Sequence, residues 1–358
     1  MTNETQTQTQ ITAVEGPPPE PARTGQKPGR LAAFSFRNIS AVYIGILLVA
    51  GFSLALPDTF ATDSTLRAIL NEQAIAAMLA IGLVIPLAAN GIDLSIGSTL
   101  GLGVIFVAWL IGNQDMATVP AILLTLVACA TVGAINGFLV TVARIDSFIA
   151  TLAMSSVVAA MIVWISNNQQ IIGLSRGFTE IASTELFGVT LPFYYMLVVA
   201  TLAWYVLEHT PIGRYLYATG GGGEAARLAG LPTKRLVFGA FLACSTIAGL
   251  AGLLATAQVG AGSPDIGSSY LLAAFAAAFL GSTQLKRGRV NVWGTVIAVY
   301  VLATGVKGLQ LAGAPFWVSE LFNGLALIVA VAAAVHEGRV SRTGRLKKRK
   351  RIGKGASR

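Results

Sequence analysis

Three ionisable side chains, Glu72, Asp93 and Lys307, lie in or beside long stretches that are otherwise apolar. Ionisable residues within membrane spans are rare and usually mark ion sites or solute paths. We expect Glu72 at the membrane interface near Arg67, and Lys307 to extend to the outer surface. Asp93 follows a chain break and is expected to accept backbone hydrogen bonds there, with a place on a solute path as the alternative.

Neutral polar side chains suit the path of a small polar solute, because such a path must hold the solute weakly. Asn136 and Gln258 lie within apolar runs and, alternatively, hydrogen-bond between helices. The predicted path candidates combine these residues with the charged ones and with the polar residues of the break: Asn90, Asp93, Ser95, Asn136, Gln258 and Lys307.

The sequence shows no constellation for catalysis. Cys129 and Cys244 lie inside apolar runs and are expected to be core residues. The two histidines are far apart, so we find no metal-site spacing and no nucleophile–base pair. The phosphate-binding pattern G-x-x-x-x-G-K-[ST] is also absent. We expect no catalytic residue, metal or cofactor on this chain.

The elements that must position these residues are membrane helices. Hydrophobic residues make up 54% of the 358 residues and charged residues 11%, whereas soluble domains carry about 25% charged residues. We expect an all-α membrane protein with about ten transmembrane helices, a broken helix near 90–97 and a short span near 268–281. The expected spans are 39–56, 68–89, 94–112, 119–142, 147–166, 191–208, 236–258, 268–281, 291–311 and 317–335.

The distribution of Lys and Arg predicts that both termini are cytoplasmic. The net charge is +9, and ten of the 25 basic residues lie in the tail that ends the chain. A basic block beside a span typically contacts anionic lipid, which argues against nucleic acid as a partner. We expect a disordered cytoplasmic segment at 1–36, a transmembrane domain at 37–336 and a basic cytoplasmic tail at 337–358.

One cytoplasmic loop, residues 209–235, contains a short predicted helix. Glycines release the chain before it, Glu224 to Ala229 favour helix, and Gly230 followed by Pro232 ends it. A helix of under two turns is unstable alone, so we expect it to dock on a partner or to pack on its own bundle. Its residues are Gly223, Glu224, Ala225, Ala226, Arg227, Leu228, Ala229 and Gly230.

Four ordered motifs lie along the chain: Asn90-Gly-Ile-Asp-Leu-Ser-Ile-Gly97, Ile145-Asp-Ser-Phe-Ile-Ala-Thr-Leu-Ala153, Thr210-Pro-Ile-Gly-Arg214 and Gly222-Gly-Glu-Ala-Ala-Arg-Leu-Ala-Gly-Leu231. Together they resemble the permease subunits of ribose-type ABC transporters, in the branched-chain amino acid/sugar permease superfamily, over residues 39–335. The last motif is similar to the cytoplasmic coupling helix of that family. Residues 281–290 depart from the family's glycine-rich pattern through three added positive charges.

The resemblance implies the permease subunit of a binding-protein-dependent ABC importer for a monosaccharide or related polyol, in the bacterial inner membrane. It implies a second permease copy or a sister permease, and two cytoplasmic ATP-binding subunits that grip the helix at 223–230. It also implies a periplasmic sugar-binding protein on outer loops that include 167–190. An ion-coupled secondary transporter, a passive channel, and an ABC permease for amino acids or nucleosides are the alternatives.

Overall fold

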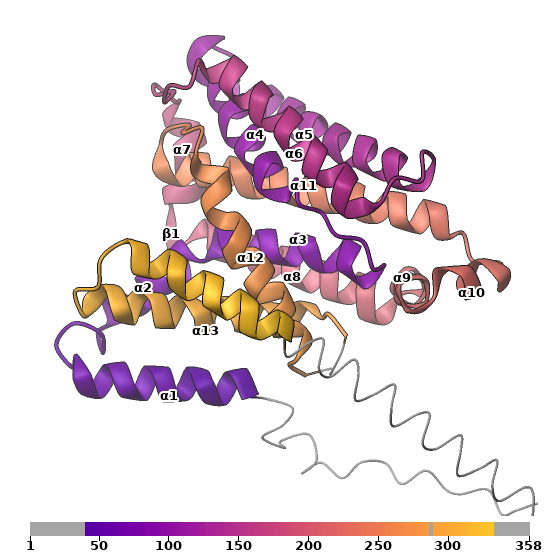
Figure 1. The fold of residues 1–358 in the computed structure, drawn as a ribbon. Coiled ribbons are helices and arrows are strands. Elements are labelled where there is room, and N and C mark those ends of the chain that lie inside the picture. The colour runs from indigo at the N-terminus through magenta and orange to yellow at the C-terminus, as the bar shows by residue number, and fades with distance from the viewer. Residues whose placement is uncertain (1–39, 286–288, 333–358) are drawn as a thin grey trace, which may run out of the picture. The chain divides into compact units, whose positions relative to one another are not determined.

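The computed structural model describes residues 40–285 and 289–332, and most of these residues lie in helices (Figure 1). The predicted segment 1–36 and the basic tail 337–358 lie outside the described residues. The apolar helices, in chain order, are α1 (Ser40–Ala55), α3 (Ala74–Ala88), α4 (Ile96–Ala108), α5 (Thr118–Thr141), α6 (Ser147–Ser166), α8 (Leu191–His209), α11 (Thr233–Val259), α12 (Ile266–Ser282), α13 (Val292–Leu311) and a last helix, Trp317–Ala332.

Shorter elements connect these helices. They are α2 (Asp63–Glu72), the π-helix η3 (Trp109–Asn113) that continues α4, α7 (Arg176–Ser183), the antiparallel strands β1 (Glu185–Leu186) and β2 (Val189–Thr190), α9 (Pro211–Gly221) and α10 (Gly223–Leu228). The sequence predicted α10 but treated the rest of 209–235, and all of 167–190, as loop. The sequence therefore did not predict helix α9. It also did not predict α7 with the β1–β2 hairpin, which together are called the α7–hairpin unit.

Each expected span overlaps one of the apolar helices, so the helical membrane architecture is confirmed. By length and composition, six of the described helices can cross a membrane, and α2 with α3 makes a seventh if this bent pair is one span. Helix α12 is one of the shorter apolar helices, as predicted. The break predicted near 90–97 is present as the non-helical connection 89–95 between α3 and α4.

Helix α11 is the central element and packs against α3, α4 and α5. Small residues allow this close packing, as is common between membrane helices. A Cβ atom on Gly133 of α5 would lie 2.6 Å from the carbonyl oxygen of Phe241 and 2.8 Å from the Cβ of Ser245, both on α11. Gly133 therefore marks a point where the two helix backbones touch.

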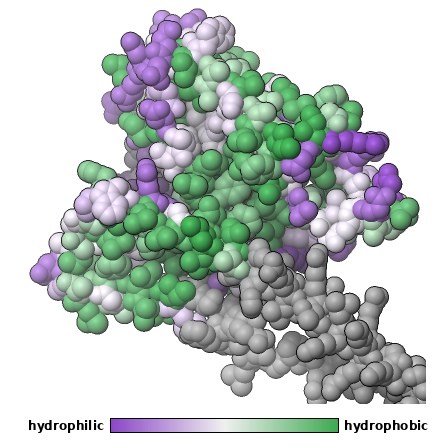
Figure 2. All heavy atoms as spheres, viewed as in Figure 1, coloured by the Kyte–Doolittle hydropathy of each residue, from purple (hydrophilic) through white to green (hydrophobic). Residues whose placement is uncertain are grey.

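Helices α5 and α6 lie at the periphery. In an apolar stretch of 18 residues in each of these helices, 28% of the stretch is buried, against 72% for α4 with η3. Their exposed side chains are large and apolar, and include Leu123, Val127, Phe138, Ile149, Leu152 and Trp164. Figure 2 shows broad hydrophobic surface over the described helices. Such a surface is suited to lipid hydrocarbon or to another membrane subunit.

Candidate functional site

The connection 89–95 is a buried, hydrogen-bonded turn into α4. The Asp93 carboxylate oxygen Oδ1 accepts hydrogen bonds from the backbone nitrogen of Ser95 at 3.0 Å and from its hydroxyl at 2.6 Å. The amide of Asn136, on α5, donates to the same hydroxyl at 2.8 Å. All three side chains are fully buried. Three of the six path candidates thus form one hydrogen-bonded network at the start of α4.

The same connection is tied to α6 by two hydroxyls. The backbone nitrogen of Ile92 donates to Ser147 Oγ at 3.1 Å, and that of Leu94 donates to Thr151 Oγ1 at 3.0 Å. Buried backbone groups outside regular structure need such partners. Two of the sequence motifs, 90–97 and 145–153, therefore contact each other directly. The sequence predicted no site role for either hydroxyl, although their four-residue spacing places both on one face of a helix.

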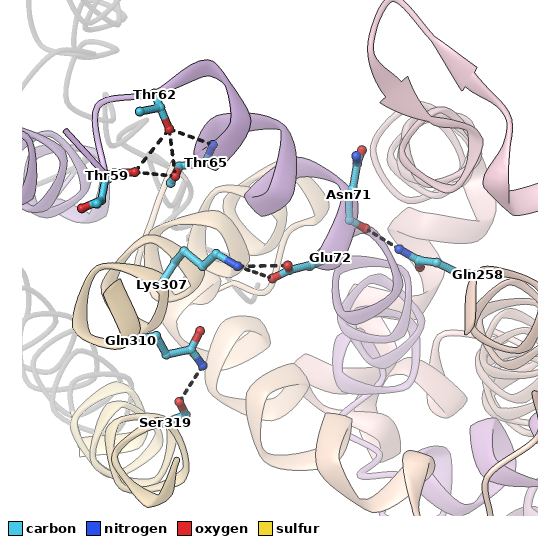
Figure 3. Close-up of polar contacts among 9 residues, drawn as sticks. All are labelled: Thr59, Thr62, Thr65, Asn71, Glu72, Gln258, Lys307, Gln310 and Ser319. Atoms are coloured by element: carbon cyan, nitrogen blue, oxygen red, sulfur yellow. Dashed lines mark hydrogen bonds and ion pairs between the residues drawn. The ribbon is translucent and has the colours of Figure 1, made fainter. Parts of the chain in front are cut away.

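A second polar cluster lies where α2 meets α3, at a bend of 40° that the sequence did not predict. The ammonium of Lys307, on α13, lies 3.0 and 3.1 Å from the two carboxylate oxygens of Glu72 (Figure 3). Glu72 lies on the same helix as Arg67, but Arg67 pairs with Asp63 at 2.7 Å, one helical turn before it. Lys307 likewise ends on a carboxylate, and its side chain is 21% exposed.

Further side chains bind the backbone at this bend. The last carbonyl groups of a helix lack intrahelical partners. Here Tyr300 donates to the Leu70 carbonyl at 3.3 Å. The amide of Gln258 donates to the Asn71 carbonyl at 3.5 Å (Figure 3). Two path candidates that lie far apart in sequence, Gln258 and Lys307, thus bind to adjacent residues of the bend, Asn71 and Glu72.

Asn90, the remaining path candidate, lies in the same connection 89–95, but its exposed side chain takes part in neither network among the described residues. It has a left-handed backbone (φ 62°) and borders a cavity of about 530 Å³ together with Tyr217 and Arg289. The guanidinium of Arg289 lies 3.4 Å from the centre of the Tyr217 ring, a cation–π contact. Of the three added positive charges in 281–290, only Arg289 lies within the described residues.

The predicted docking helix is present as α10, directly after α9. Glu224 and Arg227, predicted to share a face, form an ion pair at 2.7 Å. Ala226 is buried, whereas the Leu228 side chain is 80% exposed. Ala229 follows the helix, and Gly230 adopts a left-handed conformation (φ 82°) that ends it, as predicted. Helix α10 thus exposes an apolar residue and an ion pair.

The chain is similar to known transport proteins over most of its length. The family described as branched-chain amino acid transport system / permease component matches residues 65–331. The chain belongs to this permease family. The ribose import permease protein of Escherichia coli (strain K12) is 32% identical over 80% of this chain and 91% of the relative. No solved structure matches the permease.

Two further relatives carry other sugar names. The D-allose transport system permease protein of Escherichia coli (strain K12) is 28% identical over 86% of this chain and 94% of the relative. The L-arabinose ABC transporter permease protein of Azospirillum brasilense is 28% identical over 81% of this chain and 85% of the relative.

These comparisons confirm the resemblance seen in the sequence. The permease is a multi-pass membrane subunit of a bacterial ABC importer and not an enzyme. Membership in this family implies an ATPase and a binding protein as partners.

Proposed function

We propose that this permease moves a monosaccharide or a related small polyol into the bacterial cytoplasm. The observation that carries the proposal is its similarity, over nearly the full length of the relatives, to import permeases named for ribose, D-allose and L-arabinose. The family description names branched-chain amino acids, so an amino-acid substrate is the second candidate. The sugar is favoured because these relatives, each aligned over most of its length, are named for sugars.

The proposed architecture has ten spans with both termini in the cytoplasm. The ten expected spans leave α9 and α10 on the cytoplasmic side, where Arg214, Arg227, Lys234 and Arg235 follow the positive-inside preference. The α7–hairpin unit then lies outside, where a periplasmic sugar-binding protein would dock. The basic tail 337–358 would contact anionic lipid.

Helix α10 and the two residues after it, 223–230, are proposed as the contact to the ATPase. Two ATP-binding subunits would supply ATP and Mg²⁺, and this chain would hold no cofactor. The permease would pair with a second copy or a sister permease. ATP-driven closure of the ATPases would move α10 and switch the access of the path between the two sides of the membrane.

Uptake of radiolabelled sugars tests the proposal, in cells that carry the permease, its ATPase and its binding protein. We expect uptake to require the ATPase gene and to fall in the double variant Glu224→Ala/Arg227→Ala. The control for ATPase copurification is Arg176→Ala/Glu180→Ala, which removes an exposed ion pair of 2.9 Å on α7, away from the proposed ATPase contact. Copurification of the ATPase should fall for the first variant alone.

Two results would contradict the proposal. Uptake that persists without the ATPase and stops when the proton gradient is dissipated would identify a secondary transporter. Uptake of leucine or valine in place of every sugar tested would identify an amino-acid permease.

A further inference from the structure

A small cavity of about 240 Å³, lined by both apolar and polar side chains, lies between α4, α6 and the start of α12. Pockets that hold drug-sized ligands measure roughly 300–1,000 Å³, so this one suits a smaller molecule. Its polar lining comes from five side chains on three separate segments: Ser98, Ser155, Asn168, Asp265 and Ser268. None of the six path candidates from the sequence lines it.

The walls of this cavity are set by close helix packing. A Cβ atom on Gly97 of α4 would lie 3.0 Å from the carbonyl oxygen of Gly267 on α12, and Gly101 also faces Gly267. Glycines therefore bring α4 and α12 into backbone contact at the cavity edge. Asn168, which lines the cavity, follows α6 in a left-handed turn (φ 57°). The cavity is thus formed by rigid elements and a fixed turn.

The polar groups in the lining are available to a ligand. The side chains of Ser98, Asn168 and Asp265 make no hydrogen bond or ion pair with any residue in the described ranges 40–285 and 289–332. The hydroxyls of Ser155 and Ser268 donate to the carbonyls of Leu152 and Asp265 at 2.8 Å each and keep their acceptor lone pairs. The cavity thus offers both donors and acceptors.

We propose that this cavity is a binding subsite for a neutral monosaccharide on its way through the permease, an inference that rests on the proposed function. A sugar presents several adjacent hydroxyls, each a donor and an acceptor. The Asp265 carboxylate accepts from two such hydroxyls, and the amide of Asn168 donates to one and accepts from another. Leu94, Ile162 and Leu271 supply the apolar surface against which a sugar ring packs.

Other ligand classes fit this lining less well. No Lys, Arg or His stands among the described lining residues, and Asp265 repels an anion. A metal ion would find a single carboxylate, and the described residues hold no group of three His, Cys, Asp or Glu that suits a metal. A zwitterionic amino acid would place its carboxylate near Asp265 without a compensating cation. A neutral polyol is the class that matches every group present.

Thiol protection tests the subsite directly. Ser155→Cys places a thiol in the lining, and Ser156→Cys places one on the next, exposed residue of α6, outside the lining. The native Cys129 and Cys244 are buried. The permease–ATPase complex in detergent is treated with a methanethiosulfonate reagent while D-ribose, D-allose or L-arabinose is titrated. We expect at least one sugar to slow labelling at position 155 and to leave labelling at position 156 unchanged.

Two substitutions identify the groups that hold the sugar. Asp265→Asn removes a charged acceptor, and Asn168→Gly removes the amide while tolerating the left-handed backbone. Each should raise the protecting sugar concentration about tenfold, because a hydrogen bond to a charged or amide group is lost. Asn167→Gly, in the same left-handed turn (φ 49°) but outside the lining, is the control and should not change it.

The results separate this inference from the proposed function. ATPase-dependent sugar uptake without any sugar protection at position 155 would overturn the subsite and leave the function intact. Protection by leucine but by none of the sugars would overturn both. Equal protection at positions 155 and 156 would show a general conformational effect and would overturn the subsite.

Discussion

Lys307 and Glu72 are 235 positions apart in sequence, yet the lysine ammonium contacts both oxygens of the glutamate carboxylate. The pair joins α13 to the bend between α2 and α3. Because the Glu72 side chain is 51% exposed, solvent weakens the interaction. The pair matters because it connects α13 to the bend between α2 and α3.

A double-mutant cycle measures this tie. Lys307→Met and Glu72→Gln should each lower the thermal unfolding temperature of the permease in detergent, and the double variant should lose less than the sum. We expect a coupling energy of roughly 0.5–1 kcal/mol, as for partly exposed ion pairs. Strictly additive losses would show that the two charges do not interact. The cycle on Arg176 and Glu180, whose side chains are 92% and 55% exposed, should give less coupling.

Thr151→Val keeps the shape of the side chain and removes the hydroxyl that accepts from the Leu94 backbone. A buried donor left without a partner costs about 1–3 kcal/mol, so the unfolding temperature should drop clearly. Thr201→Val is the control, because the Thr201 hydroxyl is exposed and, within the part of the chain that the structure describes, bonds only to the Leu197 carbonyl of its own helix. Equal effects of the two substitutions would argue against a structural role for the contact between the two motifs.

Gly133→Ala should separate α5 from α11, because its new methyl group would overlap the Phe241 carbonyl. Overpacking of this kind costs typically 1–3 kcal/mol, and we expect less folded protein in the membrane. Gly239→Ala on α11 has nothing within 4 Å of the added carbon and should be neutral or slightly stabilising. Size-exclusion profiles of the two variants check the contrast, and a normal profile for Gly133→Ala would contradict it.

Leu228→Ser tests the exposed apolar residue of α10. If α10 docks in a groove of the ATPase, this substitution should reduce copurification of the ATPase and sugar uptake together, while the permease stays folded. Leu54→Ser is the comparison, because Leu54 is 85% exposed on α1, outside the proposed contact. Unchanged copurification for Leu228→Ser would contradict the docking role.

The sequence predicted the apolar helices, the break after Asn90 and the helix at α10, because each depends on local composition. It missed α9, since glycines usually end helices. Here Gly220 stays helical at the end of α9, where a side chain would overlap the Ala88 carbonyl. The bend at Gln73 has no proline or glycine to announce it. It is bound instead by side chains of distant helices, which a single sequence does not locate.

For the candidate site, too, the sequence predicted only what depends on local residue type. The path candidates were chosen by residue type, and the structure divides them between a buried network, the bend and the exposed Asn90. Ser98, Asn168 and Asp265 gave no signal, because serine in a helix and polar residues in turns are ordinary. Only the approach of α4 to α12 brings them to one cavity.

The two hydrogen bonds between 89–95 and α6 also have a metric consequence. An extended chain advances about 6.6 Å over the two residues from Ile92 to Leu94. A helix rises about 6 Å over the four residues from Ser147 to Thr151. The two lengths are similar, so two residues of the connection can bind two hydroxyls that lie one turn apart on α6. Inserting one residue between Ile92 and Leu94, or between Ser147 and Thr151, would misalign the two hydrogen bonds. These bonds therefore set where α4 begins relative to α6.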